Sequence, residues 1–273
     1  MISDIAVHLP LDPSHVPLGY AVSVAAIFDA HLSGIVLVDE FPAWATADGV
    51  IPGLIDQWSA EQQAKASKVI QTFENFARAN GLRHDSYVLG ARAGDVADRF
   101  AYVARSNDIV VIAQAPRDDD AFRNLLIEAA IFQSGRPVLI IPFVQKSGIK
   151  LERVMVCWDG SRNAARAIGD AMPFLERAQQ VSVITIETKE LPRELSSSRI
   201  SAHLARHRIN VEMKTIPARE IDAANIILNE AANSGATLIV MGGYGHTRFR
   251  ELVLGGVTRS MLQSMTVPVL MAH

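Results

Sequence analysis

The sequence predicts an α/β protein built from two successive units. Eight short runs of Val, Ile and Leu lack the alternation of a half-exposed strand, so each suits a strand covered on both faces, as in a parallel sheet. Amphipathic helical segments separate these runs, and such alternation of strands and helices is typical of an α/β fold. The runs recur in the same order in both halves of the 273-residue chain, which indicates a duplication.

The predicted strands form two sets of five. In the first half they are Ile5–Leu9, Gly34–Val38, Asp85–Leu89, Ile109–Ala113 and Val138–Ile141. In the second half they are Val154–Trp158, Val181–Ile186, Asn210–Thr215, Leu238–Met241 and Val267–Met271. The third strand of each set is more polar than the others. Apolar residues at helical spacing predict helices at Gln62–Arg78 and Ile221–Ala232.

Matching segments locate the boundary between the two units. Gly135–Ile141 has the pattern of Thr266–Ala272, and a short polar stretch around Gly148 follows the first of these segments. We therefore predict one domain at residues 1–146 and a second at residues 147–273.

The first half has a longer connection between its second and third strands. The surplus is Glu40–Ser59, which holds Trp44 and Trp58. Such an insertion can serve as a lid or an interface flap. We expect it to pack on its own domain instead, because long structureless loops are uncommon.

Composition excludes several classes of protein. The chain has 26 Lys and Arg residues against 29 Asp and Glu residues, a formal charge of −3 that argues against a basic nucleic-acid footprint. No apolar run reaches the ~18 residues of a membrane span, and the first residues lack a basic leader pattern. We therefore expect a cytoplasmic protein without nucleic-acid or membrane partners. A single cysteine, Cys157, excludes an intramolecular disulfide, and we expect it to be buried rather than reactive.

A glycine-rich segment after the predicted strand Leu238–Met241 is the strongest functional signal. It reads Gly242-Gly243-Tyr244-Gly245 and, after nine residues, Gly255-Gly256-Val257-Thr258, a G-x2-G-x9-G spacing. A loop at the carboxyl end of a parallel strand faces the crevice in which α/β sheets bind ligands. Glycine leaves no Cβ to block a phosphate, and the N–H groups of a helix start favour an anion. The pattern predicts an anion site, in preference to glycines that only make tight turns.

The first half lacks this loop. At the matching place it has Pro116, which offers no N–H, and Asp118, Asp119 and Asp120, which would repel phosphate. We predict that the first half binds no triphosphate.

Two further motifs have more than one interpretation. Asp159 and Ser161 follow a buried strand, where either residue can cap the next helix; a ribose-binding role for Asp159 is compatible with capping. His203 and His207 stand at i,i+4 on an expected helix, a spacing that can hold a metal. We favour a solvated surface helix, because two histidines alone make an incomplete site.

These motifs resemble those of the universal stress protein family in its tandem form. The resemblance covers nearly the whole chain; it is strong for Arg153–His273 and weaker for Met1–Phe143. It implies a doubly wound, adenine-nucleotide alpha-hydrolase-like fold in which each unit is a five-stranded parallel sheet with helices on both faces. It also implies pairing through the last strands, either of two halves within one chain or of two chains in a homodimer.

The resemblance further implies an adenine-nucleotide site, since nucleotide-binding members hold the phosphates of ATP on the glycine motif. Residues that match the family pattern are Met241 and Gly242 at the strand end, Tyr244 and Gly245 in the loop, Gly255, Val257 and Thr258 at the phosphate helix, Asp159 at the sugar and base end, and Ile186 over adenine. Gly256 stands where the family often has Ser or Thr, so one hydroxyl is lost. That departure puts the strength of ATP binding, and any assistance by Mg²⁺, in question.

The resemblance makes an ATP-binding stress-response protein the expected function, a nucleotide-dependent regulatory or protective module rather than an efficient enzyme. No general base is evident beside the glycine loop, although some family members are weak ATPases. Two alternatives stay open. One is a slow ATP hydrolase at the same site, and the other is a nucleotide-independent dimeric scaffold, which the glycine at position 256 favours.

Overall fold

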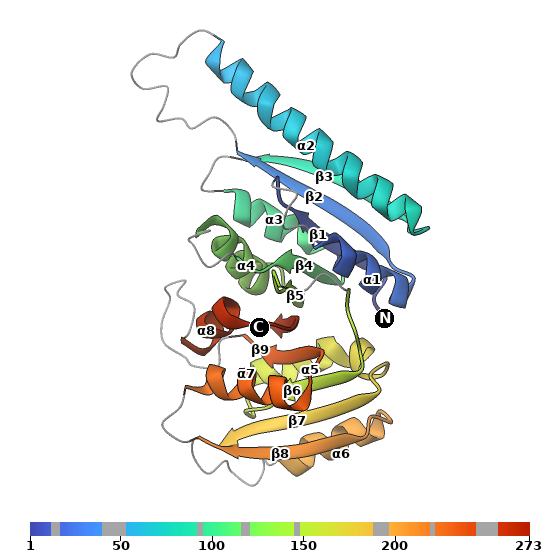
Figure 1. Cartoon of the computed structure of the whole chain (residues 1–273), viewed down its shortest axis with the longest axis vertical. Coiled ribbons are helices and arrows are strands. Elements are labelled where there is room, and N and C mark those ends of the chain that lie inside the picture. Colours follow the sequence, from blue (N-terminus) through green and yellow to red (C-terminus); the bar gives the residue numbers. More distant parts are fainter. Residues whose placement is uncertain are drawn as a thin grey trace. The chain divides into compact units, whose positions relative to one another are not determined.

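The computed structural model confirms the α/β fold (Figure 1). It describes residues 1–11, 17–39, 53–91, 95–115, 121–144, 148–187, 197–218, 222–243 and 256–273. All ten predicted strands are present, with ends shifted by up to three residues. Contacts group the elements into two units, each of which is described by itself.

Unit 1 contains a parallel sheet with the strand order β3-β2-β1-β4. Its strands are β1 (Asp4–Leu9), β2 (His31–Asp39), β3 (His84–Ala91) and β4 (Ile109–Ala113). Its helices are α1 (Leu18–Phe28), α2 (Leu54–Ala79), α3 (Val96–Ala104) and most of α4 (Ala121–Gln133). Nearly every residue of β1 and β4 is buried, which explains why these strands read as continuous apolar runs.

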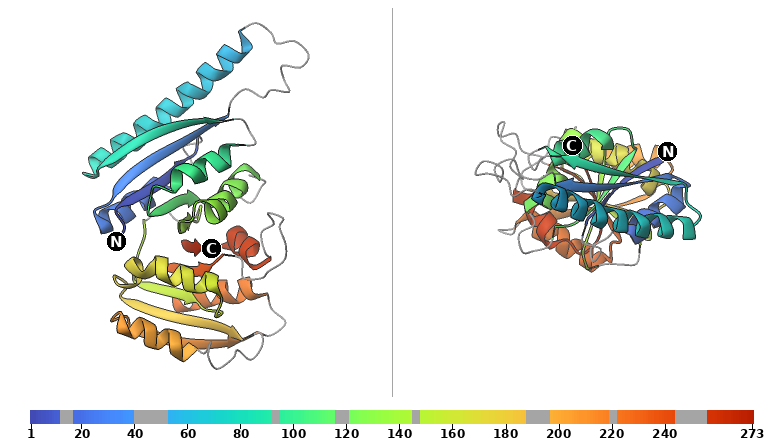
Figure 2. Two further views of the ribbon diagram at one scale, coloured as in Figure 1. Left: turned by 180° about the vertical axis from the view of Figure 1, so that it is seen from behind. Right: turned by 90° about the horizontal axis from the view of Figure 1, so that it is seen from above.

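Helix α2 begins eight residues before the predicted start at Gln62 and runs past one end of the sheet (Figure 2). Its buried residues start only at Ala66, so the preceding turns have no core-facing stripe for a periodicity argument to detect. Leu54 and Ile55 are about two-fifths exposed, at 39% and 40%. The described end of the insertion, residues 53–59, is mostly exposed, with Trp58 half-buried. Residues 40–52, including Trp44, lie outside the described part, so packing of the insertion on its own domain stays a prediction.

Unit 2 contains a sheet with the strand order β5-β10-β9-β6-β7-β8. Its strands are β5 (Val138–Ile141), β6 (Arg153–Cys157), β7 (Gln180–Glu187), β8 (Val211–Pro217), β9 (Leu238–Gly242) and β10 (Val269–Ala272). Its helices are α5 (Arg162–Leu175), α6 (Ser197–Arg206), α7 (Ala223–Ser234) and α8 (Gly256–Ser264). The last strands of the two repeats, β5 and β10, pair antiparallel, whereas the other neighbours are parallel.

The chain path in unit 2 explains how both faces of its sheet are covered. From β6 the chain moves outward to β7 and β8, then returns to β9 and β10 on the other side of β6. Right-handed crossovers then put α5 and α6 on one face and α7 and α8 on the other. Contacts assign β5 to unit 2, although it precedes residue 146; the division at 146/147 drawn from the sequence stays a prediction.

Candidate functional site

The carboxyl ends of β6, β7 and β9 bring several predicted site residues to one edge of the unit 2 sheet. These strands are neighbours or near neighbours and run in the same direction. Ligands of open α/β sheets bind in the crevice outside this edge. Asp159 follows β6, Ile186 lies one residue from the end of β7, and Met241 and Gly242 end β9. Ile186 is partly exposed, whereas the side chain of Met241 is buried.

Asp159 and Ser161 make different hydrogen bonds at the start of helix α5. The Ser161 hydroxyl accepts a hydrogen bond from the Ala164 N–H at 3.1 Å, so Ser161 is the N-cap. Asp159 Oδ1 accepts from the Ser161 N–H at 2.9 Å and shapes the preceding turn. The exposed Asp159 side chain keeps a second carboxylate oxygen that has no partner among the described residues. Capping by Ser161 thus leaves Asp159 available for a ligand.

Two buried polar atoms at this edge have no hydrogen-bond partner among the residues that the structure describes. They are Nε1 of Trp158 and Oγ1 of Thr185. Trp158 directly follows β6, and its backbone N–H donates to Ile184 O at 2.8 Å, which places it beside Thr185 in the register of β6 and β7. Burying an unpaired N–H or hydroxyl costs free energy, and such groups in a native fold call for a specific reason. A polar ligand bound at this edge would supply hydrogen-bond partners for both atoms.

Gly242 ends β9 where the strand passes very close to the start of α5. A Cβ at this position would lie 2.6 Å from the Ala164 nitrogen and 2.6 Å from the Asn163 carbonyl carbon. No side chain fits there without moving the helix. The glycine at 242 is therefore required by packing, a structural reason that is separate from any role toward phosphate.

The beginning of the glycine loop is held by two residues that sequence reasoning missed, Asn163 and His273. The buried Asn163 side chain donates from Nδ2 to Gly243 O at 2.6 Å. Nδ1 of His273 lies 3.0 Å from that Nδ2 and 3.1 Å from Gly243 O. Asn163 is 80 positions from Gly243 and 110 positions from His273 in the sequence, so no local pattern connects them. Their contacts fix the backbone where β9 leads into the loop.

Helix α8 begins with Gly256, Val257 and Thr258. Gly256 is exposed, and a Cβ added there would meet nothing within 4 Å. Thr258 is only 3% exposed and shares the buried face of the helix with Met261 and Leu262, so its hydroxyl is not presented to solvent. A ligand at this helix start would thus meet mainly the backbone N–H groups of the first turn, which lack intrahelical partners. Three predicted loop residues lie outside the described part of the chain, namely Tyr244, Gly245 and Gly255.

The first repeat lacks an equivalent of Asp159. Strand register aligns Ile5 with Val154, since Ile5 pairs with Ile109 as Val154 pairs with Leu238. Counting onward, Pro10 stands in the place of Asp159. A proline offers neither a carboxylate nor an N–H. This adds a second reason, independent of the acidic segment at 118–120, why the first repeat should not bind a triphosphate.

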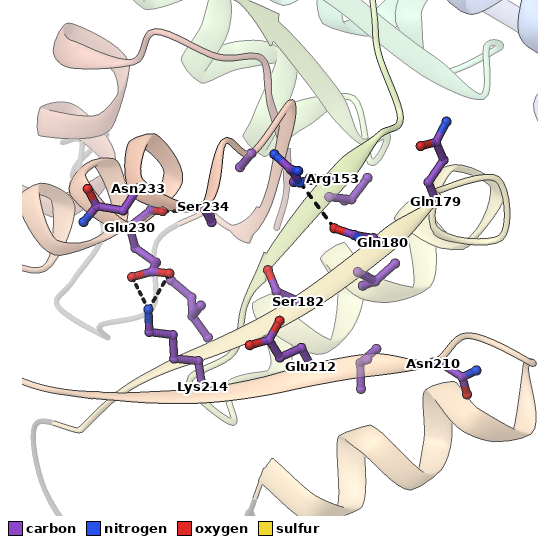
Figure 3. A pocket seen from close by; sticks show the side chains of 15 residues that line it. Arg153, Gln179, Gln180, Ser182, Asn210, Glu212, Lys214, Glu230, Asn233 and Ser234 are labelled. Atoms are coloured by element: carbon purple, nitrogen blue, oxygen red, sulfur yellow. Dashed lines mark hydrogen bonds and ion pairs between the residues drawn. The ribbon is translucent and has the colours of Figure 1, made fainter.

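A separate groove of about 840 Å³ lies over the amino-terminal parts of β6, β7 and β8 (Figure 3). Its charged side chains are Arg153, Glu212, Lys214 and Glu230. Lys214 Nζ contacts both carboxylate oxygens of Glu230, at 2.7 and 2.8 Å. Two cations and two carboxylates offset each other, so the groove does not select ligands by net charge. It is at the opposite end of the strands from the candidate site.

Cys157, at the end of β6, is held as a neutral thiol. Burial raises the pKa of this thiol to about 12, and the nearby Asp159 carboxylate adds to the shift. Cys157 itself is half-buried. A thiolate is the nucleophilic form of cysteine, so the raised pKa lowers the reactivity of this thiol at neutral pH.

The described residues hold no cluster of three or more His, Cys, Asp and Glu side chains that suits a metal ion. His203 and His207 lie with ring centroids 4.9 Å apart on an exposed surface at the end of α6. None of the helices that the structure describes combines the length and the apolarity needed to cross a membrane.

Comparison with known proteins finds a family match for the second half of the chain. The sequence model of the universal stress protein family matches residues 150–273. The carboxyl-terminal half of the chain is therefore similar to the universal stress protein family. The Universal stress protein Slr1230 of Synechocystis is 22% identical over 218 residues, which span 76% of this chain and 71% of that protein.

Solved structures extend the likeness in fold to both repeats. The crystal structure of a universal stress protein from Archaeoglobus fulgidus covers 98% of this chain and 95% of its own, with a TM-score of 0.73 and 19% identity. A functionally unknown protein, PA1789, from Pseudomonas aeruginosa covers 99% of this chain and 92% of its own, with a TM-score of 0.65 and 14% identity. At these identities the structures support a shared fold: two units of the universal stress protein type in tandem.

Proposed function

We propose that the second half of this chain binds one adenine nucleotide, ATP or a close relative, at the carboxyl edge of β6, β7 and β9. The observation that carries the proposal is a pair of buried polar atoms, Trp158 Nε1 and Thr185 Oγ1, which have no partner in the described part of the chain and lie next to the exposed Asp159 carboxylate. A ribose and a base present hydroxyls and nitrogen acceptors that such groups bind, and acidic residues bind ribose hydroxyls in related crevices. The phosphates would meet the first turn of α8.

The nucleotide would act as a ligand that stabilises one state of a regulatory or protective module in the cytoplasm. A ligand that binds only the folded form stabilises it by mass action, by about 2.7 kcal/mol at a hundredfold excess over Kd. We propose that no efficient catalysis takes place. Pairing of the two repeats within one chain is favoured over a homodimer through the same strands, because β5 and β10 already pair with each other.

Binding is tested by denaturing freshly purified protein, identifying any released nucleotide, and titrating the emptied full chain with ATP and Mg²⁺ by calorimetry. We expect about one ATP per chain, with ATP recovered unchanged.

Asp159→Asn keeps the oxygen that accepts from Ser161 but loses the charge, so it should weaken ATP binding about tenfold. Asp170→Asn is the matched control, since Asp170 pairs with Arg166 farther along α5. Absence of heat at millimolar ATP would reject the nucleotide and favour the scaffold; two ATP per chain would contradict a silent first repeat.

Gly256→Ser should strengthen ATP binding several-fold. The position is exposed, a Cβ there meets nothing within 4 Å, and the new hydroxyl can donate to a phosphate at the first turn of α8. Serine is also a better helix residue than glycine, so stability should not fall. The comparison is a calorimetric titration of both proteins, with Gly256→Ala as the control that adds a methyl without a hydroxyl. Equal affinity of the serine and alanine variants would show that the hydroxyl makes no contact.

A further inference from the structure

Gln114, a residue of the first repeat, is built into the surroundings of helix α8. It directly follows β4, and its backbone N–H donates to Ile141 O of β5 at 2.8 Å. Contacts group it with unit 2 rather than with the strand it follows. Strand register makes it the counterpart of Gly243, because Ile109 aligns with Leu238. A long amide side chain thus stands where the second repeat begins its glycine loop.

Both ends of the Gln114 amide are used in a buried environment. The residue is 1% exposed. Its Nε2 donates to Leu262 O of α8 at 2.8 Å, and its Oε1 accepts from the Phe143 N–H at 3.2 Å. One partner needs a donor and the other needs an acceptor. Glutamate cannot donate, methionine can do neither well, and asparagine is one methylene too short, so glutamine is specifically suited to the position.

The bond to Leu262 satisfies a carbonyl that the helix itself leaves open. Leu262 lies in the last turn of α8, where the final four carbonyl groups have no intrahelical donor. Leu262 and Met261 also anchor this end of the helix by burial, at 4% and 0% exposure. The other end begins with Gly256, which is exposed and has no side chain that could anchor the helix. The Gln114 bond therefore adds an anchor at the carboxyl-terminal end of α8 to the packing of its buried face.

Gln114 is itself fixed by a second buried side chain. Arg123, 6% exposed, donates from Nη1 to Gln114 O at 3.3 Å. The backbone of Gln114 is thus held by Arg123 and by Ile141, which leaves its amide a defined place from which to reach α8.

We infer that Gln114 is a positioning residue for the phosphate end of the nucleotide site: the repeat that lacks the glycine loop holds the helix on which the other repeat binds phosphate. This inference rests on the proposed function. It gives the first repeat a role other than binding a nucleotide itself. It also predicts that changes at Gln114 act on the phosphates of the ligand and leave the adenosine part unaffected.

The test compares ATP with adenosine, which lacks phosphates, by calorimetry on the full chain. Gln114→Glu and Gln114→Met should raise the Kd for ATP about tenfold and leave the Kd for adenosine within a factor of two. Hydrogen exchange of the α8 amides should become faster in both variants. Gln133→Glu and Gln133→Met are the matched controls, because Gln133 donates to Asp98 in an exposed hydrogen bond, and they should change none of these values. If one of the Gln114 variants does not fold, Gln114→Asn is measured in its place, because its amide is one methylene shorter.

The outcomes separate the two proposals. If the wild-type chain binds ATP and the Gln114 variants bind it equally well, the positioning role is wrong while the nucleotide site stands. If ATP and adenosine weaken together, the effect is a general loss of structure and the inference is also wrong. If the wild-type chain binds neither compound, the proposed function fails and the inference falls with it.

Discussion

Replacing Gly242 with alanine is expected to destabilise the protein by about 2–3 kcal/mol, in the upper range for overpacking of a tight contact. The new Cβ would lie 2.6 Å from backbone atoms of Asn163 and Ala164. Backbone atoms cannot rotate away as a side chain can, so the start of α5 has to shift. That shift would disturb the Ser161 cap and the Asn163 bond to Gly243 O as well. Urea unfolding monitored by circular dichroism measures the loss.

Gly169→Ala is the control for this substitution. Gly169 lies inside α5, is exposed, and would place its Cβ in open space. Alanine is the better residue in a helix interior, so this variant should gain about 0.5–1 kcal/mol. We therefore expect the free energy of unfolding to fall in Gly242→Ala and to rise in Gly169→Ala. If Gly242→Ala were as stable as the wild type, the close approach of β9 to α5 would be wrong.

Cys157 is expected to react with iodoacetamide about a thousandfold more slowly in the native protein than in the unfolded chain at pH 8. Burial raises the pKa of its thiol from 9.0 to about 12, and each pKa unit lowers the thiolate fraction about tenfold below both values. The rate is measured by mass spectrometry with and without urea. The unfolded chain is its own control, since the same thiol then has its ordinary pKa. A native rate within tenfold of the unfolded one would contradict the raised pKa of this half-buried thiol.

The same pKa shift makes stability depend on pH at the alkaline end. The folded protein keeps the thiol neutral, while the unfolded chain ionises above pH 9, so the unfolded state binds fewer protons between about pH 9 and 12. The contribution of Cys157 to stability is therefore fully present below pH 9 and is lost as the pH rises toward 12. Comparison of wild type and Cys157→Ala by urea unfolding at pH 8 and pH 10 isolates this group from other titrations. The difference between the two proteins should shrink by roughly 1 kcal/mol over that interval.

Local sequence patterns predicted most elements of this fold, because the buried positions of a helix or strand are occupied by apolar residues at regular spacing. Strands covered on both faces, such as β4 and β9, are unbroken apolar runs, and the half-exposed edge strand β8 is more polar. The same logic located Asp159 at a strand end. It failed at the beginning of α2, because those turns have no buried face and thus no apolar stripe.

The candidate site required the tertiary structure for a different reason. Thr185 is an ordinary strand residue in the sequence, and only the register of β6 and β7 places its unpaired hydroxyl beside Trp158. Gln114 and Leu262 are 148 positions apart, and neither their residue types nor their spacing predicts the hydrogen bond between them. By itself, the sequence determined the α/β class, the duplication, and the repeat that carries the glycine loop. Which side chains meet at the ends of the strands was decided only by packing, since contacts between distant segments leave no periodic trace along the chain.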